Sequence, residues 1–244
     1  MKALIFAAGL GERMRPLTDR TPKPLLVAGG KPLIVWHLEK LAAMGVRDVV
    51  VNVSWLAEQF PAVLGDGARW GLRIHYSHEG ATPLETGGGM LHALRLLRSD
   101  ESSNDDGDDR DTPFLAVNGD IWTDFDFNRL PRQPPGDAHL VMVDNPTHHP
   151  GGDFALSADG ILRSEGEAKL TFAGIGMYRP NLLQHWHRVI GTTPGVEETP
   201  PRFKLAPLLR HAMELGRATG THHAGAWTDV GTPERLRALD CALD

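Results

Sequence analysis

The sequence predicts an α/β protein with a Rossmann-like, mixed but mostly parallel sheet that is flanked by helices. Short apolar runs typical of buried strands alternate with segments of helical periodicity over residues 1–145. Polar loops containing glycine follow several of these runs, at the sheet edge where ligands of parallel sheets bind. We expect a single domain over residues 1–244, in which 1–145 and 146–244 contribute different parts of one binding site.

The first half supplies most of the expected sheet. Residues 3–8 are apolar throughout, as in a strand buried on both faces. A helix is expected over 32–44, because apolar residues recur at helical spacing between Pro32 and Gly45. The next expected elements are a β-branched strand at 48–53, a strand at 72–76, a helix at 89–97 that follows a glycine cluster, and strands at 113–117 and 139–143.

The second half shows a more hairpin-like pattern. Asp159-Gly160 is a turn signal between two short apolar runs. Strands are expected at 170–178 and 226–230, with an amphipathic helix at 203–215 and a closing helix at 233–243. The sequence contains no internal repeat, which removes one common device for trimerisation, so we expect a monomer or a weak dimer.

Composition excludes several classes of partner. The formal net charge is −6, which argues against binding to nucleic acid or to acidic membranes. No run approaches the ~20 apolar residues of a membrane span. The one cysteine, Cys241, permits no internal disulfide, and the first residues do not resemble a signal peptide, so we expect a cytoplasmic protein. Residues 99–112 are acidic and lack apolar side chains, which predicts a surface insertion.

Residues 9–25, here called the phosphate loop, combine three features that suit a polyphosphate. Gly9 and Gly11 allow backbone N–H groups to approach an anion closely. Arg13 and Lys23 add positive charge, and nearby prolines stiffen the segment. The loop is neither a P-loop nor a dinucleotide fingerprint, because Lys23 is not followed by Ser or Thr and a third glycine is missing.

The same loop carries a family resemblance. It reads Ala7-Ala8-Gly9-Leu10-Gly11-Glu12-Arg13-Met14-Arg15-Pro16-Leu17-Thr18, with Pro22-Lys23-Pro24-Leu25, and it resembles the signature of sugar-1-phosphate nucleotidyltransferases. Those enzymes join an NTP to a sugar 1-phosphate and release pyrophosphate on a GT-A-like fold. The resemblance implies that Arg13, Lys23 and Asp120 are catalytic. It implies nucleotide contacts at Leu10, Gly11, Glu12, Arg13, Lys23, Glu79, Thr86 and Gly87.

Two aspartates follow expected strands in motifs that the family uses for Mg²⁺. They are Asp120 in Asn118-Gly119-Asp120 and Asp229 in Trp227-Thr228-Asp229. Mg²⁺ prefers hard oxygen ligands and commonly takes one or two carboxylates together with substrate phosphates. We therefore expect Asp120 and Asp229 to bind it. A turn residue or a helix cap is the alternative for a lone aspartate at such a position.

Segments in the second half resemble one branch of the family, whose members use UTP and N-acetylmuramate 1-phosphate in bacterial cell-wall recycling. This resemblance implies sugar-phosphate contacts at Asn118, Asp153, Gly174 and Lys204. The Glu-Lys-Pro segment of hexose-specific relatives is absent, since residues 165–169 read Glu-Gly-Glu-Ala-Lys, so Lys169 does not take over its role. Paired His148 and His149 are expected in a hydrated loop, with metal binding as the alternative.

Two other functions remain open from the sequence. The first is transfer to mannose, glucose or heptose 1-phosphate from GTP, dTTP or UTP. The second is a nucleotide-sensing module without catalysis, which the joint presence of the two cations and the two aspartates disfavours. A dinucleotide-dependent oxidoreductase is a weaker third alternative, because the phosphate loop is rich in proline.

Overall fold

The computed structural model describes residues 1–98 and 111–243. The acidic insertion predicted at 99–112 lies, except for Asp111 and Thr112, outside the described residues.

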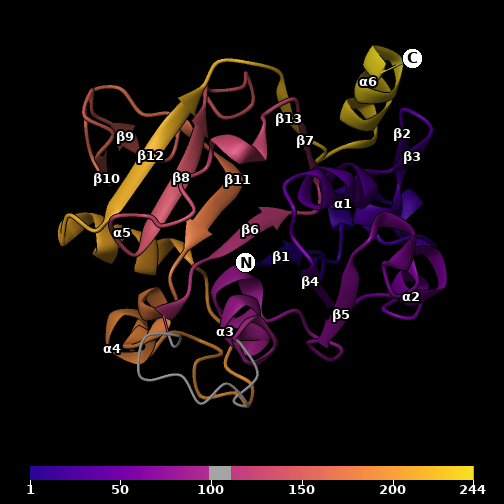
Figure 1. Cartoon of the computed structure of the whole chain (residues 1–244), viewed down its shortest axis with the longest axis horizontal. Coiled ribbons are helices and arrows are strands. Elements are labelled where there is room, and N and C mark those ends of the chain that lie inside the picture. Colours follow the sequence, from indigo (N-terminus) through magenta and orange to yellow (C-terminus); the bar gives the residue numbers. More distant parts are fainter. Residues whose placement is uncertain (99–110, 244) are drawn as a thin grey trace.

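Within the described residues, seven strands form one mixed sheet (Figure 1). Across the sheet they lie in the order β12 (Ala218–His223), β8 (Ala138–Val143), β11 (Thr171–Tyr178), β6 (Phe114–Asn118), β1 (Lys2–Phe6), β4 (Asp48–Val53) and β5 (Arg73–His78). All neighbouring pairs are parallel except the two that involve β11, which is antiparallel to β6 and to β8. The predicted mixed, mostly parallel sheet is therefore confirmed.

Helices cover both faces of the sheet because successive strand residues point to opposite sides. On one face Ala3 and Ile5 pack with α1 (Leu33–Ala43) and α2 (Gln59–Leu64). On the other face Leu4 packs in a cluster with the helices α3 (Glu85–Leu97), α4 (Trp186–Ile190) and α5 (Ala206–Glu214). A third cluster lies under the C-terminal helix α6 (Pro233–Leu243), which stands beside the first hairpin, β2 (Val27–Ala28) and β3 (Lys31–Pro32).

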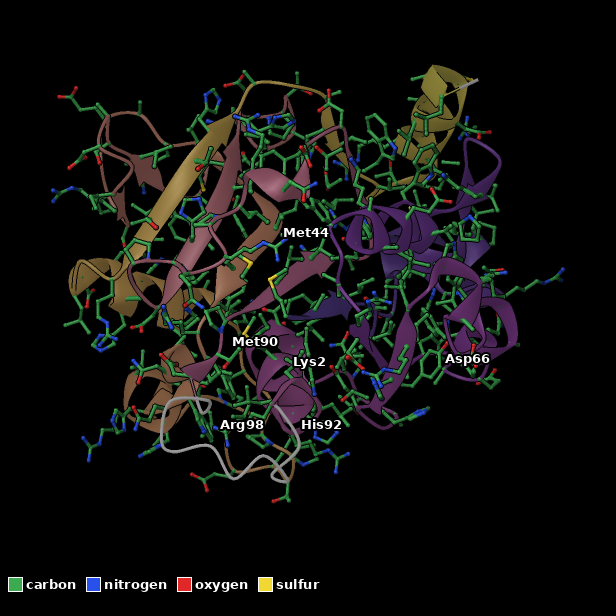
Figure 2. The ribbon with its side chains drawn as sticks, viewed as in Figure 1. Lys2, Met44, Asp66, Met90, His92 and Arg98 are labelled. Atoms are coloured by element: carbon green, nitrogen blue, oxygen red, sulfur yellow. The ribbon has the colours of Figure 1, made fainter. Side chains whose placement is uncertain are left out.

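Helix α3 is held against the middle of the sheet at two points (Figure 2). Met90, fully buried, belongs to the apolar cluster that contains Leu4 of β1. At the C-terminal end of the helix the Lys2 ammonium donates hydrogen bonds to the carbonyls of Leu96 (3.0 Å) and Arg98 (2.6 Å). A cation at a helix C-terminus satisfies free carbonyls and complements the helix dipole.

The structure differs from the sequence prediction in several elements. Helix α3 begins at Glu85 and not at Gly89 within the glycine cluster, so Gly87, Gly88 and Gly89 all lie inside the helix. Glycine is unfavourable in the interior of a helix. A Cβ at Gly87 would lie 2.6 Å from the Phe203 ring, so close packing requires glycine here in spite of its low helix propensity. Strand β12 and the short helices α2 and α4 were not predicted. The predicted turn at Asp159-Gly160 is confirmed between β9 (Ala155–Leu156) and β10 (Leu162–Arg163).

The centre of the sheet is a topological switch point. Strand β1 lies between β4 and β6. The chain adds β4 and β5 on one side of β1 and then returns to add β6 on its other side. The last residue of β1, Phe6, is in register with Asn52 of β4 and Asn118 of β6. Ligands of open α/β sheets bind in the crevice outside the carboxyl ends of such strands. The fold therefore directs attention to the loops that follow Phe6, Asn52 and Asn118.

No described helix combines the length and the apolar character that crossing a bilayer requires.

Candidate active site

A cavity of about 660 Å³ opens at this switch point. Its wall consists of the phosphate loop, the ends of three parallel strands, the N-terminus of α3 and two segments of the second half. The lining residues are Phe6, Ala7, Ala8, Gly9, Leu10, Gly11, Glu12, Arg13, Met14, Lys23, Pro24, Asn52, Glu79, Thr82, Pro83, Glu85, Thr86, Asn118, Asp120, Arg202 and Gly231. The cavity is large enough for a small-molecule ligand. The predicted residues Leu10, Gly11, Glu12, Arg13, Lys23, Glu79, Thr86, Asn118 and Asp120 all lie on its wall.

The phosphate loop turns sharply at Gly11. This residue has a φ of 66°, and a Cβ there would lie 2.8 Å from the Thr18 methyl group. The Thr18 hydroxyl donates a hydrogen bond to the Gly11 carbonyl (2.8 Å), and Met14 N–H donates to the same carbonyl (2.8 Å). These bonds hold the turn in place and leave its backbone facing the cavity. Only glycine adopts this positive φ readily and also fits a position where a Cβ would collide with Thr18.

The two cations of the loop differ in surroundings. Lys23 is 12% exposed, and its ammonium forms an ion pair of 2.5 Å with the Asp120 carboxylate, which comes from the turn after β6. Arg13 is exposed, and no ion pair engages it within the described residues. One cation is therefore fixed on the floor of the cavity, and the other is free to move onto a bound anion.

Glu79 braces two walls of the cavity. Its carboxylate accepts hydrogen bonds from the Asn52 side-chain amide (2.5 Å) and from Leu84 N–H (2.7 Å). Asn52 in turn accepts a hydrogen bond from Ala7 N–H (2.6 Å) at the start of the phosphate loop. Burial raises the pKa of the Glu79 carboxyl, while the hydrogen bonds from Leu84 and Asn52 oppose that shift. Glu79 thus links the phosphate loop to the segment before α3.

The glycine-rich start of α3 is packed against the segment before α5. The N–H groups of Gly87 and Gly88 donate to the Phe203 carbonyl (2.9 and 3.0 Å), and Leu205 N–H donates to the Thr86 hydroxyl (3.2 Å). Thr86 lines the cavity, whereas Gly87 faces Phe203 and does not. Lys204 is exposed and also lies outside the lining.

The predicted sugar-phosphate residues lie at different depths. Asn118 lines the cavity, and Gly174 lies directly behind it, since a Cβ at Gly174 would be 2.6 Å from the Asn118 amide nitrogen. Asp153 accepts a hydrogen bond from Phe172 N–H (2.8 Å) and lies 3.2 Å from His149. Gly174 therefore packs against Asn118, and neither Gly174 nor Asp153 belongs to the lining itself.

The two predicted metal ligands lie next to a pair of neighbouring strands, Asp120 in the turn before β7 (Ile121–Thr123) and Asp229 at the end of β13 (Trp227–Asp229). Strand β13 pairs with β7, and Val230 N–H donates to the Asp120 carbonyl (2.8 Å). Asp120 lines the cavity, and Asp229 lies beside it, two residues before the lining residue Gly231. The described residues contain no cluster of three or more His, Cys, Asp or Glu side chains suited to a metal. This donor set fits Mg²⁺, which takes one or two carboxylates and completes its shell with phosphate oxygens and water.

Several lining residues were not predicted from the sequence. Asn52 is a polar residue inside an apolar β-branched strand, and that contrast was an available signal. Arg202 reaches the cavity from the second half of the chain, where the local sequence gave no sign of it, and Gly231 lies two residues after the predicted metal ligand Asp229. His148 lies in an exposed loop, as the sequence predicted, and its imidazole is 2.9 Å from the Asp229 carboxylate.

Comparisons with known proteins agree with this geometry. The model of the nucleotidyl transferase family matches residues 2–148. The chain is 46% identical to N-acetylmuramate alpha-1-phosphate uridylyltransferase of Neisseria meningitidis serogroup B, over 97% of this chain and 96% of that protein. It is 34% identical to the protein of the same name from Caulobacter vibrioides, over 99% and 96%. A crystal structure described as a glucose-1-phosphate thymidylyltransferase of Bacillus anthracis superposes with a TM-score of 0.80 at 18% identity, over 100% of this chain and 95% of the other, which shows a shared fold.

Proposed function

Because the chain belongs to the nucleotidyl transferase family, we propose that it transfers the UMP group of UTP to N-acetylmuramate 1-phosphate, giving a nucleotide sugar and pyrophosphate. The protein is thus a sugar-1-phosphate nucleotidyltransferase. The observation that carries the proposal is the cavity itself. It brings the phosphate loop, Lys23, Asn118 and Asp120 together at the switch point of the sheet.

The reaction is an in-line displacement at phosphorus. An oxygen of the sugar phosphate attacks the α-phosphorus of UTP, and a new P–O bond forms. The bond from the α-phosphorus to the bridging oxygen breaks, and pyrophosphate leaves with that electron pair. Because the attacking phosphate is already an anion, the residues need not remove a proton. Their task is to position the reactants and to offset charge.

We assign this task to residues of the cavity. The Gly11 turn and Arg13 would bind the β- and γ-phosphates of UTP, which become pyrophosphate. Lys23 would contact the α-phosphate and the incoming sugar phosphate, and Asn118 would bind beside it. Asp120 and Asp229 would hold Mg²⁺. When bound, Mg²⁺ neutralises phosphate charge and polarises the phosphorus centre.

The nucleobase and ribose would lie against the segment that contains Thr86, which the Glu79 brace holds in place. Gly87, which follows Thr86, packs directly against the Phe203 ring, because a Cβ there would lie 2.6 Å from it.

Two observations favour N-acetylmuramate over a simple hexose. The two relatives described above, which align along nearly the whole chain, carry that sugar in their names. Lys169, the only candidate for the lysine of a Glu-Lys-Pro segment, pairs with Glu165 at 2.8 Å and does not line the cavity. We further propose that the reaction takes place in the cytoplasm, in cell-wall recycling, on a single domain that is monomeric or weakly dimeric.

A substrate panel tests the proposal. Purified protein with Mg²⁺ is incubated with each of UTP, GTP and dTTP in combination with the 1-phosphates of N-acetylmuramate, N-acetylglucosamine, glucose, mannose and heptose. Pyrophosphate release and the mass of the nucleotide sugar are followed. We expect the highest kcat/KM for UTP with N-acetylmuramate 1-phosphate. A higher value for another pair would overturn the sugar assignment, and nucleotide binding without turnover for any pair would revive the sensing module.

A further inference from the structure

The Asp229 carboxylate is held at one of its two oxygens. The Arg235 guanidinium donates a hydrogen bond of 2.8 Å from Nη1 to Asp229 Oδ1. His148, which comes from a distant loop, has its Nε2 2.9 Å from the same oxygen and accepts a hydrogen bond of 2.5 Å from Arg235 Nη1. No described residue hydrogen-bonds Oδ2, which faces Gly231 on the cavity wall, since a Cβ at Gly231 would lie 3.2 Å from it. One oxygen is therefore held, and the other has no hydrogen-bond partner among the described residues.

The Arg235 side chain fills the space behind the cavity wall. It is only 20% exposed, and its Nε is buried without a hydrogen-bond partner in the described part of the chain. Its Nη2 occupies the position that a Cβ at Gly231 would take. The absence of a side chain at Gly231 therefore leaves the space in which the guanidinium meets the Asp229 carboxylate.

Helix α6 fixes the position of this guanidinium. Leu236 and Leu239 are buried in the third apolar cluster together with Met14 of the phosphate loop. Farther along the helix, Asp240 accepts a hydrogen bond of 2.8 Å from Gly29 N–H. The first turn of α6 therefore presents Arg235 from a rigid support, as a residue that orients another side chain requires.

We propose that Arg235 and His148 form a clamp that orients Asp229 for Mg²⁺, in which Arg235 holds the carboxylate and His148 holds the guanidinium, and that both are positioning residues of the active site. The inference rests on the proposed function, because it presumes a metal between Asp229 and the substrate phosphates. Carboxylates that bind metals are commonly oriented by hydrogen bonds from outside the coordination shell, and loss of such a partner typically weakens metal binding about 10- to 100-fold.

The sign of the effect distinguishes orientation from simple electrostatics. Arg235 carries a positive charge next to a cation site. If it acted only through its charge, its removal would tighten metal binding, because like charges repel. If it orients the carboxylate, its removal frees Asp229 to rotate, and metal binding weakens. The clamp predicts the second outcome.

The experiment measures Mn²⁺ binding to the protein without substrates, by water proton relaxation. We expect Arg235→Met to raise the Mn²⁺ Kd by roughly 10- to 100-fold. Arg235→Lys, which keeps a donor, restores part of the affinity, and His148→Asn weakens binding by a smaller factor. In an Asp229→Ala background the Arg235→Met change has no further effect, because the side chain that it orients is gone.

Arg237→Met is the matched control. Arg237 is 73% exposed on the same helix and pairs with Glu234, so its removal changes charge by the same amount without touching Asp229. A Kd for Arg235→Met that equals or falls below the wild-type value would overturn the clamp. Absence of Mn²⁺ binding by the wild-type protein would also overturn the clamp, whereas absence of nucleotide transfer with every substrate of the panel would mean that the proposed function itself fails. Thermal melting of each variant shows whether it is folded.

Discussion

Lys23 and Asp120 form the most direct charge contact on the floor of the cavity, where their side-chain atoms are 2.5 Å apart. In the free protein each neutralises the other. When substrates bind, Lys23 can contact phosphate oxygens, and Asp120 becomes available to a cation. The ion pair thus holds Lys23 and Asp120 in position until substrates bind, when each contacts a different group.

Lys23→Met should lower kcat by roughly 100- to 1,000-fold, a typical loss when a donor to developing charge is removed. The melting temperature should change little, because the partner Asp120 is 36% exposed and stays hydrated. Steady-state kinetics and thermal melting check both parts.

The control is Arg15→Met in the same loop. Arg15 is 58% exposed and pairs only with Asp19 among described residues, so kcat should remain near the wild-type value. Equal losses for the two variants would mean that Lys23 acts through the general charge of the loop and not at a defined position.

Glu79 gives a prediction about pH. Burial raises its pKa in the folded protein above the ordinary value of 4.5, so the folded state binds this proton more tightly than the unfolded state. Its stabilising contribution is then fully present below about pH 4.5 and is lost as pH rises through the folded pKa. Glu79→Gln, which cannot ionise, lacks this dependence.

The measurement is urea unfolding of wild type and Glu79→Gln between pH 4.5 and neutrality. The free energy of unfolding of the wild type, minus that of the variant, should fall as pH rises. A difference that grows with pH would show that ionised Glu79 is stabilising, contrary to the burial effect.

Among the elements, α6 has an importance beyond its place at the end of the described chain. It covers the third apolar cluster, which includes Met14 of the phosphate loop, and it carries Arg235. The helix therefore touches both the nucleotide side and the metal side of the proposed site.

Leu239→Ala should lower the free energy of unfolding by about 2–5 kcal/mol, because it leaves a cavity in that cluster. Leu239 is 6% exposed in the structure, whereas Leu215, 56% exposed, provides a control whose replacement by alanine should be nearly neutral. Denaturant unfolding measures both. If the two variants lose the same stability, α6 is not anchored as described.

Strand β12 illustrates what an element's own sequence could not reveal. Its inward positions hold Ala218 and Gly220, which give no apolar signal, and its other positions carry threonine and histidine. The strand forms because β8 offers a parallel partner and because Thr219 and Thr221 contact His139 across the pair. Such pairing depends on the completed sheet, so the local pattern predicted no strand.

For the whole molecule, the sequence predicted what depends on local chemistry. The fold class followed from periodicity, and the phosphate loop was recognisable because its glycines and cations lie within one short segment. The Glu79 brace and the Arg235–His148 clamp were not predictable, because each joins residues from separate segments through hydrogen bonds. Side chains that act through other side chains leave little trace in a single sequence.

The most direct test of the account as a whole is the turnover of Asp120→Asn with UTP and N-acetylmuramate 1-phosphate in saturating Mg²⁺, compared with wild type. Asparagine keeps the size of Asp120 and removes the charge that pairs with Lys23. The account predicts a loss of at least ~100-fold in kcat, with a melting temperature close to that of wild type. Near-normal kcat in this variant would contradict the placement of the reaction in this cavity.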